Sequence, residues 1–210
     1  MKPIDVQVTS DFICPWCWIG HRKLQQAIRD SELSVQPRLV YQPYELNPQM
    51  PQGGLDRKAY RTAKFGSWAR SQAMDAEVAQ VGQSVGADFH YERVLITPNT
   101  RQAHRLMQFA QKHGDAQQVD VLYESIFFAY FSLGEDIGQI ETLTRLAHQA
   151  GLDSSVARSF LESEEELDAL IARELQAHSE GIASVPTFRI NGTQVSGAQP
   201  AHVLAAVLSA

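Results

Sequence analysis

The two cysteines of this 210-residue chain, Cys14 and Cys17, are separated only by Pro15 and Trp16. A disulfide between them would close a very short loop, which constrains the unfolded chain little. The spacing therefore favours thiol–disulfide chemistry or metal binding over a structural cross-link. In thiol–disulfide chemistry one thiolate is the nucleophile, and the second cysteine resolves the mixed disulfide that the first one forms.

The cysteine pair lies where a predicted strand passes into a predicted helix. Apolar and polar residues alternate over residues 4–8, which indicates a short strand. A helical pattern begins at Pro15, and proline costs little in a first turn because its missing N–H would have no partner there. Cys14 would then face the free N–H groups and the positive end of the helix dipole, which favour the thiolate. Cys17, one turn further on, should be more buried.

The middle of the chain reads differently from its two ends. A second strand is predicted over residues 35–44, and a loop rich in proline and glycine follows it to residue 54. From about residue 56 to 182 the chain reads as helices throughout. Apolar residues recur there at helical spacing in four stretches, which we interpret as core faces. These stretches cover residues 103–110, 119–130, 140–150 and 167–175.

Strand character returns near the C-terminus. Residues 187–190 and 193–196 flank Asn191-Gly192, a dipeptide typical of tight type I′ hairpin turns. A last helix is predicted after Pro200. The order β-α-β, helical block, β-β-α predicts an α/β protein in which residues 1–55 and 183–210 form one domain. Residues 56–182 would be an inserted all-helical subdomain, because the terminal strands need the first ones to form a stable sheet.

This order of elements, with C-x-x-C at the first helix, describes the thioredoxin fold. The dipeptide Val185-Pro186 precedes the third strand. In that arrangement the corresponding peptide bond is cis and faces the cysteines, and we expect the same of Pro186. The Val185 backbone would then be free to pair with an extended substrate segment. Pro15, Trp16, Val185 and Pro186 are accordingly the residues expected to shape the substrate site.

Four parts of the chain together match one known family. They lie within Ser10–Gly20, Asn99–Leu106, Gly134–Gly138 and Val185–Pro200, and they span nearly the whole sequence. On these segments the chain resembles the DsbA-type thioredoxin-fold oxidoreductases, in their cytoplasmic FrnE-like branch. The resemblance implies a thioredoxin fold with a helical insertion and a dithiol–disulfide exchange reaction. It makes Cys14 the nucleophile, Cys17 the resolving thiol and Pro186 the cis-proline.

One residue departs from the periplasmic members of that family. Those oxidants carry histidine between the cysteines, whereas this chain carries Trp16. A protonated histidine can stabilise a thiolate by its charge, and an indole cannot. We therefore expect a weaker oxidant. Reductase, isomerase and peroxide-linked exchange all stay open as its role.

Two other functions fit parts of the pattern. Glutathione-dependent enzymes of the kappa transferase and hydroxychromene-carboxylate isomerase type share this fold, but they often have serine in place of the first cysteine. The intact pair argues against them. A metal-binding module could group Cys14, Cys17 and His21. A closed zinc site needs four ligands, however, and no second pair of ligands with suitable spacing exists. We expect no metal, and we interpret His21 as an exposed or hydrogen-bonded helix residue.

The composition is that of an ordinary globular protein, with 44% hydrophobic and 20% charged residues. The net charge of −6 gives no reason to expect a nucleic-acid partner. No apolar run approaches the ~18 residues of a membrane span, and no secretory leader is recognised, so we expect a cytoplasmic protein. The expected partners are protein or small-molecule thiols and disulfides. No cofactor is expected besides the redox-active disulfide, with glutathione as a candidate co-substrate, and a homodimer stays open.

Overall fold

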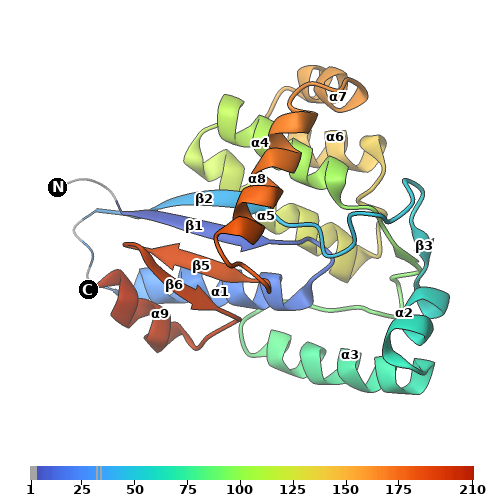
Figure 1. Ribbon diagram of the computed structural model, residues 1–210, viewed down its shortest axis with the longest axis horizontal. Helices are drawn as coiled ribbons and strands as arrows, with labels where there is room; N and C mark the ends of the chain where they lie inside the picture. The colour runs from blue at the N-terminus through green and yellow to red at the C-terminus, as the bar shows by residue number, and fades with distance from the viewer. Residues whose placement is uncertain (1–3, 32, 34) are drawn as a thin grey trace.

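The computed structural model describes residues 4–31, 33 and 35–210. Its main sheet has the strand order β2-β1-β5-β6, with β1 parallel to β2 and antiparallel to β5. Helices α1 and α9 lie side by side along this sheet (Figure 1). The strands are β1 (Asp5–Ser10), β2 (Arg38–Pro43), β5 (Thr187–Ile190) and β6 (Thr193–Ser196), and the two helices are α1 (Pro15–Asp30) and α9 (Ala201–Leu208).

These six elements confirm the predicted thioredoxin order, β-α-β followed by β-β-α. The two strands of the β5–β6 hairpin have the predicted bounds, because the turn between them depends on local backbone conformation alone. Asn191 and Gly192 both have positive φ, 49° and 80°, as a type I′ turn demands. Pro200 precedes α9 as its N-cap, and Leu204 and Leu208 of that helix are buried. The predicted fold class is therefore confirmed.

The segment between β2 and β5 holds the remaining elements. Two short strands, β3 and β4, pair antiparallel in a small second sheet. A π-helix, η1 (Ala129–Leu133), directly continues one of the α-helices. The other elements are β3 (Leu55–Asp56), α2 (Arg57–Phe65), α3 (Trp68–Gln83), β4 (Ile96–Thr97), α4 (Arg101–His113), α5 (Ala116–Phe128), α6 (Ile140–Gln149), α7 (Ser154–Glu162) and α8 (Leu167–Ser179).

The expectation of an all-helical insertion is wrong for residues 84–100. Gly86 adopts positive φ of 74° just after α3, a conformation that ends helices. Pro98 lacks the N–H that a continuing helix would need. Between them the chain makes a turn at residues 91–93 and then forms β4. The division into 1–55 with 183–210 and 56–182 stays a prediction, because side chains from both parts pack in one continuous hydrophobic core.

Three of the four apolar stretches bury the predicted faces, and the fourth does not. Leu106, Ile126 and Leu143 are fully buried on α4, α5 and α6. On α8, by contrast, Leu170 is buried while Leu175 is 64% exposed. The reason is that α8 contacts the rest of the protein mainly through β2 and α4, so only a narrow side of it is covered. Within the residues described, no helix has the length and apolar character needed to cross a bilayer.

The α1–α5 contact forms the aromatic centre of the core. Trp18 is completely buried, and its ring lies 6.2 Å from that of Phe127 and 5.1 Å from that of Phe89. Its indole N–H donates a 2.9 Å hydrogen bond to Glu124 on α5. This contact fixes the helix that carries the cysteines against the inserted segment.

A half-buried carboxyl group on α8 makes the stability of the fold depend on pH. Glu174 accepts a 2.9 Å hydrogen bond from the backbone N–H of Glu45. Burial, followed by the nearby Glu45 carboxylate, raises the pKa of Glu174 to about 7. An unfolded glutamate has a pKa of about 4.3, so the folded state binds this proton more tightly. The free energy of unfolding must therefore fall as the pH rises from about 4.3 to about 7.

We expect Glu174→Gln to abolish this loss, because glutamine keeps the accepting oxygen and does not titrate. Since Glu174 is partly exposed, solvent screening reduces the effect, and we expect the variant to be more stable than wild type by about 1 kcal/mol at pH 8. At pH 4 the two proteins should be equally stable. Urea unfolding at both pH values measures this difference, and a gap of the same size at pH 4 would contradict the titration.

Candidate active site

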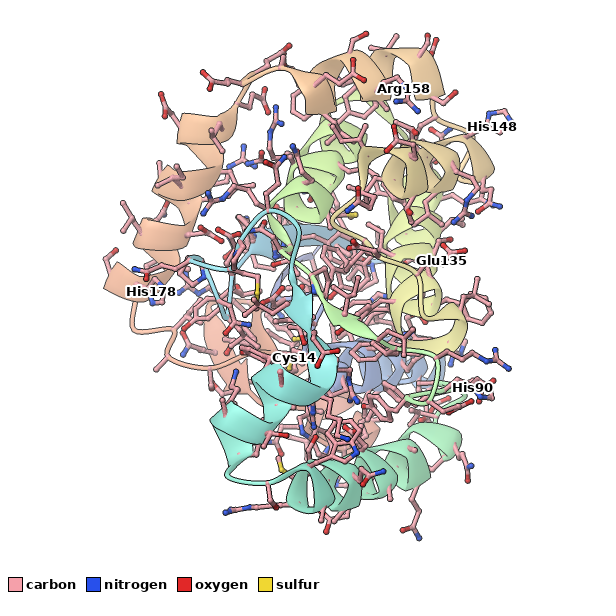
Figure 2. The ribbon with its side chains drawn as sticks, turned by 90° about the vertical axis from the view of Figure 1, so that its right-hand side faces the viewer. Cys14, His90, Glu135, His148, Arg158 and His178 are labelled. Carbon is pink, nitrogen blue, oxygen red and sulfur yellow. The ribbon has the colours of Figure 1, made fainter. Side chains whose placement is uncertain are left out.

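Cys14 is the N-cap of α1, and Pro15 is its first helical residue. The Cys14 N–H donates to the Asp11 carbonyl and the Cys17 N–H donates to the Cys14 carbonyl, both at 3.0 Å, so the chain turns tightly into the helix. The described structure holds both cysteines as free thiols. Cys14 is 7% exposed and Cys17 is fully buried, so only the first thiol is open to a reactant. Cys14 lies next to α2 in Figure 2.

The Val185-Pro186 peptide bond is cis and lies against the cysteines, as predicted. The Cys14 thiol donates to the Val185 carbonyl with an S···O distance of 3.7 Å. This contact requires glycine on the facing turn of α1. A Cβ atom at Gly20 would come within 2.9 Å of the Pro186 ring and 3.1 Å of the Phe188 ring. Gly20 therefore lets the proline loop approach the helix closely.

Cys17 occupies an apolar position behind Cys14. The backbone N–H of Asp11 donates to its sulfur at 3.5 Å. Burial is the main cause that raises the pKa of Cys17 well above its usual value, and interactions with the Cys14 thiol add to it. At neutral pH Cys17 is accordingly a thiol, and it becomes a nucleophile only when a reaction at Cys14 changes its surroundings.

We expect iodoacetamide at pH 7 to modify Cys14 and to leave Cys17 unmodified in the folded protein. The thiolate fraction of a cysteine falls tenfold for each unit by which its pKa rises, so the rates should differ by at least about tenfold. Peptide mass spectrometry after timed quenching measures both rates. Guanidinium-unfolded protein is the control, in which both cysteines should react alike; faster labelling of Cys17 in the folded protein would reverse the assigned roles.

A buried acidic group and a histidine meet behind the cysteine pair. His104 and Asp11 are almost completely buried, and their Nε2 and Oδ1 atoms are 3.4 Å apart. The other Asp11 oxygen accepts a 2.6 Å hydrogen bond from the Leu46 N–H. The sequence gives no signal for this contact, because His104 and Asp11 are distant in the chain and only the fold brings them together.

His21 lies neither at the surface nor with the cysteines. The sequence predicts an exposed or hydrogen-bonded residue, and exposure is wrong, because His21 is fully buried. Its Nε2 atom lies 3.3 Å from Asp120 and 3.4 Å from Glu124. Its ring is turned toward α5 and packs against Tyr123. The set of Cys14, Cys17 and His21 that a metal site would need is therefore not assembled in the described structure.

A cleft of about 120 Å³ opens beside Cys14. Cys14 and Pro15 form part of its wall, and Arg57, Arg61 and Lys64 of α2 form another part. Tyrosine and phenylalanine rings complete the lining, among them Tyr60, Phe65, Tyr91, Tyr130 and Phe131. Sequence analysis did not single out the three cations. Their spacing of i, i+4 and i+7 places them on one helix face, and this spacing is the feature of the sequence from which a positively charged face could have been predicted.

The residues expected to shape the substrate site differ in whether they line the cleft. Pro15 lines the cleft, and the Val185 carbonyl faces the Cys14 thiol. Trp16 is 41% exposed and lies outside the set of residues that line the cleft. Its indole is therefore available at the rim of the site to a large partner. The roles of these residues in binding stay predictions.

Comparisons with known proteins agree with this geometry. The model of the DSBA-like thioredoxin domain family matches residues 5–209. The uncharacterized protein YwbO of Bacillus subtilis (strain 168) is 28% identical over 207 residues, which are 98% of this chain and 96% of that protein. The crystal structure of the probable DsbA oxidoreductase SCO1869 from Streptomyces coelicolor matches with a TM-score of 0.89 and 26% identity, covering 98% of this chain and 88% of that one.

The same fold also occurs in an isomerase. The structure of 2-hydroxychromene-2-carboxylate isomerase matches with a TM-score of 0.72 and 15% identity, over 98% of this chain and 94% of that one. A likeness at this level of identity shows the fold alone. Because one fold hosts both reactions, the activity has to be argued from the residues of the site.

Proposed function

Because the chain belongs to the family of DSBA-like thioredoxin domains, we propose that it is a thiol–disulfide oxidoreductase. Cys14 and Cys17 would exchange two electrons with the thiols or disulfides of proteins or small molecules. The observation that carries this proposal is the asymmetry of the pair. The Cys14 thiol borders a cleft at the start of a helix, while the Cys17 thiol is fully buried one turn behind it.

The proposed reaction in the reducing direction has two displacement steps. The Cys14 thiolate attacks one sulfur of a disulfide R–S–S–R′, which forms a Cys14–S–S–R bond and releases R′–S⁻. Cys17 then gives its proton to the solvent and attacks the Cys14 sulfur, which forms the Cys14–Cys17 disulfide and releases R–S⁻. The substrate has gained two electrons, and its two thiolates take up protons from the solvent. An external dithiol returns the pair to its starting state.

Surrounding groups support each step. Cys14 is the N-cap of α1, at the end of the helix where the helix dipole is positive. The Val185 carbonyl, which contacts the Cys14 thiol, is a backbone acceptor that an extended substrate could use in its place. Glutathione remains a candidate co-substrate. Membership of the FrnE-like branch and a cytoplasmic setting, both implied by the sequence resemblance, belong to the same proposal.

The glutathione-dependent isomerase reaction is the alternative for this fold. Those enzymes typically lack the intact cysteine pair, whereas this chain holds both cysteines, with Cys14 in the wall of a cleft. Disulfide exchange needs a second thiol that resolves the mixed disulfide, whereas the isomerisation does not need one. We therefore prefer the oxidoreductase.

The test is the reduction of insulin by dithiothreitol, followed by the turbidity of the released B chain. We expect the purified protein to shorten the lag before precipitation and to increase its rate in proportion to protein concentration. Protein alkylated beforehand at its cysteines is the control and should be inactive. If native and alkylated protein behave alike with insulin and with small disulfides, the proposed function is wrong.

A further inference from the structure

Helix α2 turns one positively charged face toward the cleft beside Cys14. Arg57, Arg61 and Lys64 follow one another at intervals of four and three residues, so they project from the same side of the helix. All three line the same cleft as the Cys14 thiol. This face is positive although the protein as a whole carries a net charge of −6. The charge next to the reactive thiol is thus opposite in sign to that of the whole protein.

The three cations are only partly neutralised. Arg57 and Arg61 share a single carboxylate, that of Asp75, at 2.7 and 2.8 Å. No carboxylate of the described residues lies within 4.0 Å of the Lys64 ammonium group. Three positive charges against one negative charge leave an excess of two. Burial lowers the pKa of Arg61, and the positive charge of Arg57 adds to this effect while the Asp75 carboxylate opposes it.

Hydrogen bonds hold the unpaired ammonium group in place. Lys64 donates to the Tyr60 hydroxyl oxygen at 2.9 Å, and that hydroxyl in turn donates to Asn47 at 2.6 Å. A lysine on an exposed helix would otherwise sample many rotamers, which would weaken its attraction for a ligand. The Lys64–Tyr60–Asn47 chain therefore gives the cleft a positioned charge.

A buried hydroxyl in the cleft wall also lacks a partner. The Tyr91 hydroxyl is buried and makes no hydrogen bond to any residue that the structure describes. Leaving a buried polar group without a partner costs about 1–3 kcal/mol. Such a group therefore marks a place where a ligand can supply the missing hydrogen bond. Burial raises the pKa of Tyr91, so its hydroxyl stays protonated and can donate. An acceptor that carries negative charge would complement both this donor and the excess of positive charge.

From these contacts we propose that the cleft binds the carboxylate of a small disulfide substrate, with Lys64 and Arg61 as its charged partners and Tyr91 as a hydrogen-bond donor. This inference rests on the proposed function and names its substrate class. A carboxylate bound there would lie in the same cleft as Cys14, so the substrate disulfide could reach the thiol. The carbon chain between them would pack against the cleft aromatics, such as Phe65 and Tyr130. The two displacements already described then release two carboxylate-bearing thiols.

The size of the site favours a small molecule over a folded protein. The cleft holds about 120 Å³, and its walls leave Cys14 only 7% exposed. A short aliphatic arm ending in a carboxylate fits this space. A protein disulfide would have to bring an extended strand to the Val185 side, where α2 supplies no charge.

The experiment compares three disulfides that differ mainly in charge: 3,3′-dithiodipropionate (anionic), bis(2-hydroxyethyl) disulfide (neutral) and cystamine (cationic). Each is reduced with dithiothreitol as the electron donor, and kcat/KM is measured for wild type, Lys64→Met and Lys64→Glu. Lys58→Glu is the matched control, because Lys58 is an exposed residue of the same helix that does not line the cleft. Circular dichroism verifies that every variant is folded.

We expect wild type to prefer the anionic disulfide, and Lys64→Glu to lower kcat/KM for it by about tenfold, since attraction is replaced by repulsion. Lys64→Met should lie between the two, and the neutral disulfide should change less than twofold. The preference should also weaken as ionic strength rises. Equal wild-type rates for all three disulfides, or equal effects of Lys64→Glu and Lys58→Glu, would overturn this inference and leave the oxidoreductase standing. Failure to reduce any of the three would overturn this inference, and it would also defeat the proposed function if insulin is not reduced either.

Discussion

Replacing Cys14 by serine should reduce insulin-reducing activity to the uncatalysed background, a loss of at least about a hundredfold. The serine hydroxyl has nearly the size of the thiol, so the start of α1 and its contact with Val185 should keep their geometry. What is lost is the nucleophile, because an aliphatic hydroxyl does not ionise near neutral pH. The turbidity assay with insulin and the reduction of bis(2-hydroxyethyl) disulfide both measure this loss.

Cys17→Ser is the matched variant and should fail at a different step. Cys14 still attacks the disulfide there, but no thiol stands behind it to release the mixed disulfide. Intact-protein mass spectrometry should then show an adduct of the substrate thiol on Cys14. Because this variant has no second thiol, the adduct should persist until an external thiol removes it. A Cys14→Ser protein with undiminished activity, or the adduct on Cys17 in place of Cys14, would show that the nucleophile is misassigned.

The second large effect concerns stability. Trp18→Ala should lower the free energy of unfolding by about 3–5 kcal/mol, the usual cost of truncating a fully buried large aromatic residue. The substitution would leave a cavity between Phe89 and Phe127 and would remove the hydrogen bond to Glu124. Because this contact joins α1 to α5, the activity should decline together with the stability.

Trp16→Ala is the control for the same residue type, two positions away on the same helix. Trp16 is 41% exposed, so its removal should change the free energy of unfolding by no more than about 0.5 kcal/mol. Urea unfolding followed by far-ultraviolet circular dichroism gives both values without depending on tryptophan emission. Similar losses for the two variants would mean that the burial of Trp18 does not stabilise the protein as described.

The parts of the fold that sequence predicts well are those fixed by local chemistry. The Asn191-Gly192 turn fixes the β5–β6 hairpin by its backbone conformation, and Pro15 marks the start of α1. The exposed side of α8 could not be predicted in this way. Its apolar stripe looks like that of a core helix, and whether Leu175 is covered depends on how far neighbouring elements extend. The π-helix η1 and the β3–β4 ladder likewise arise from packing between distant segments.

In the candidate site, too, some features can be predicted from local sequence and others depend on contacts between distant segments. The motif identifies Cys14 and Cys17, and the order of the elements places Pro186 against them. The Asp11–His104 contact escapes sequence analysis, because the two residues belong to different elements and meet only in the folded chain. Lys64 is a different case. Its helical spacing from Arg57 is visible in the sequence, but nothing local shows that this face borders the cysteine cleft.

The position of β1 between β2 and β5 has a consequence for the order in which the protein becomes active. During translation Cys14 leaves the ribosome long before β5 exists, and until then β1 has only its parallel neighbour. The loop that faces Cys14 arrives with β5, so the reactive thiol and its opposite wall come together only once nearly the whole chain has been made. Chains that still lack β5 would therefore carry both cysteines without the loop that faces Cys14.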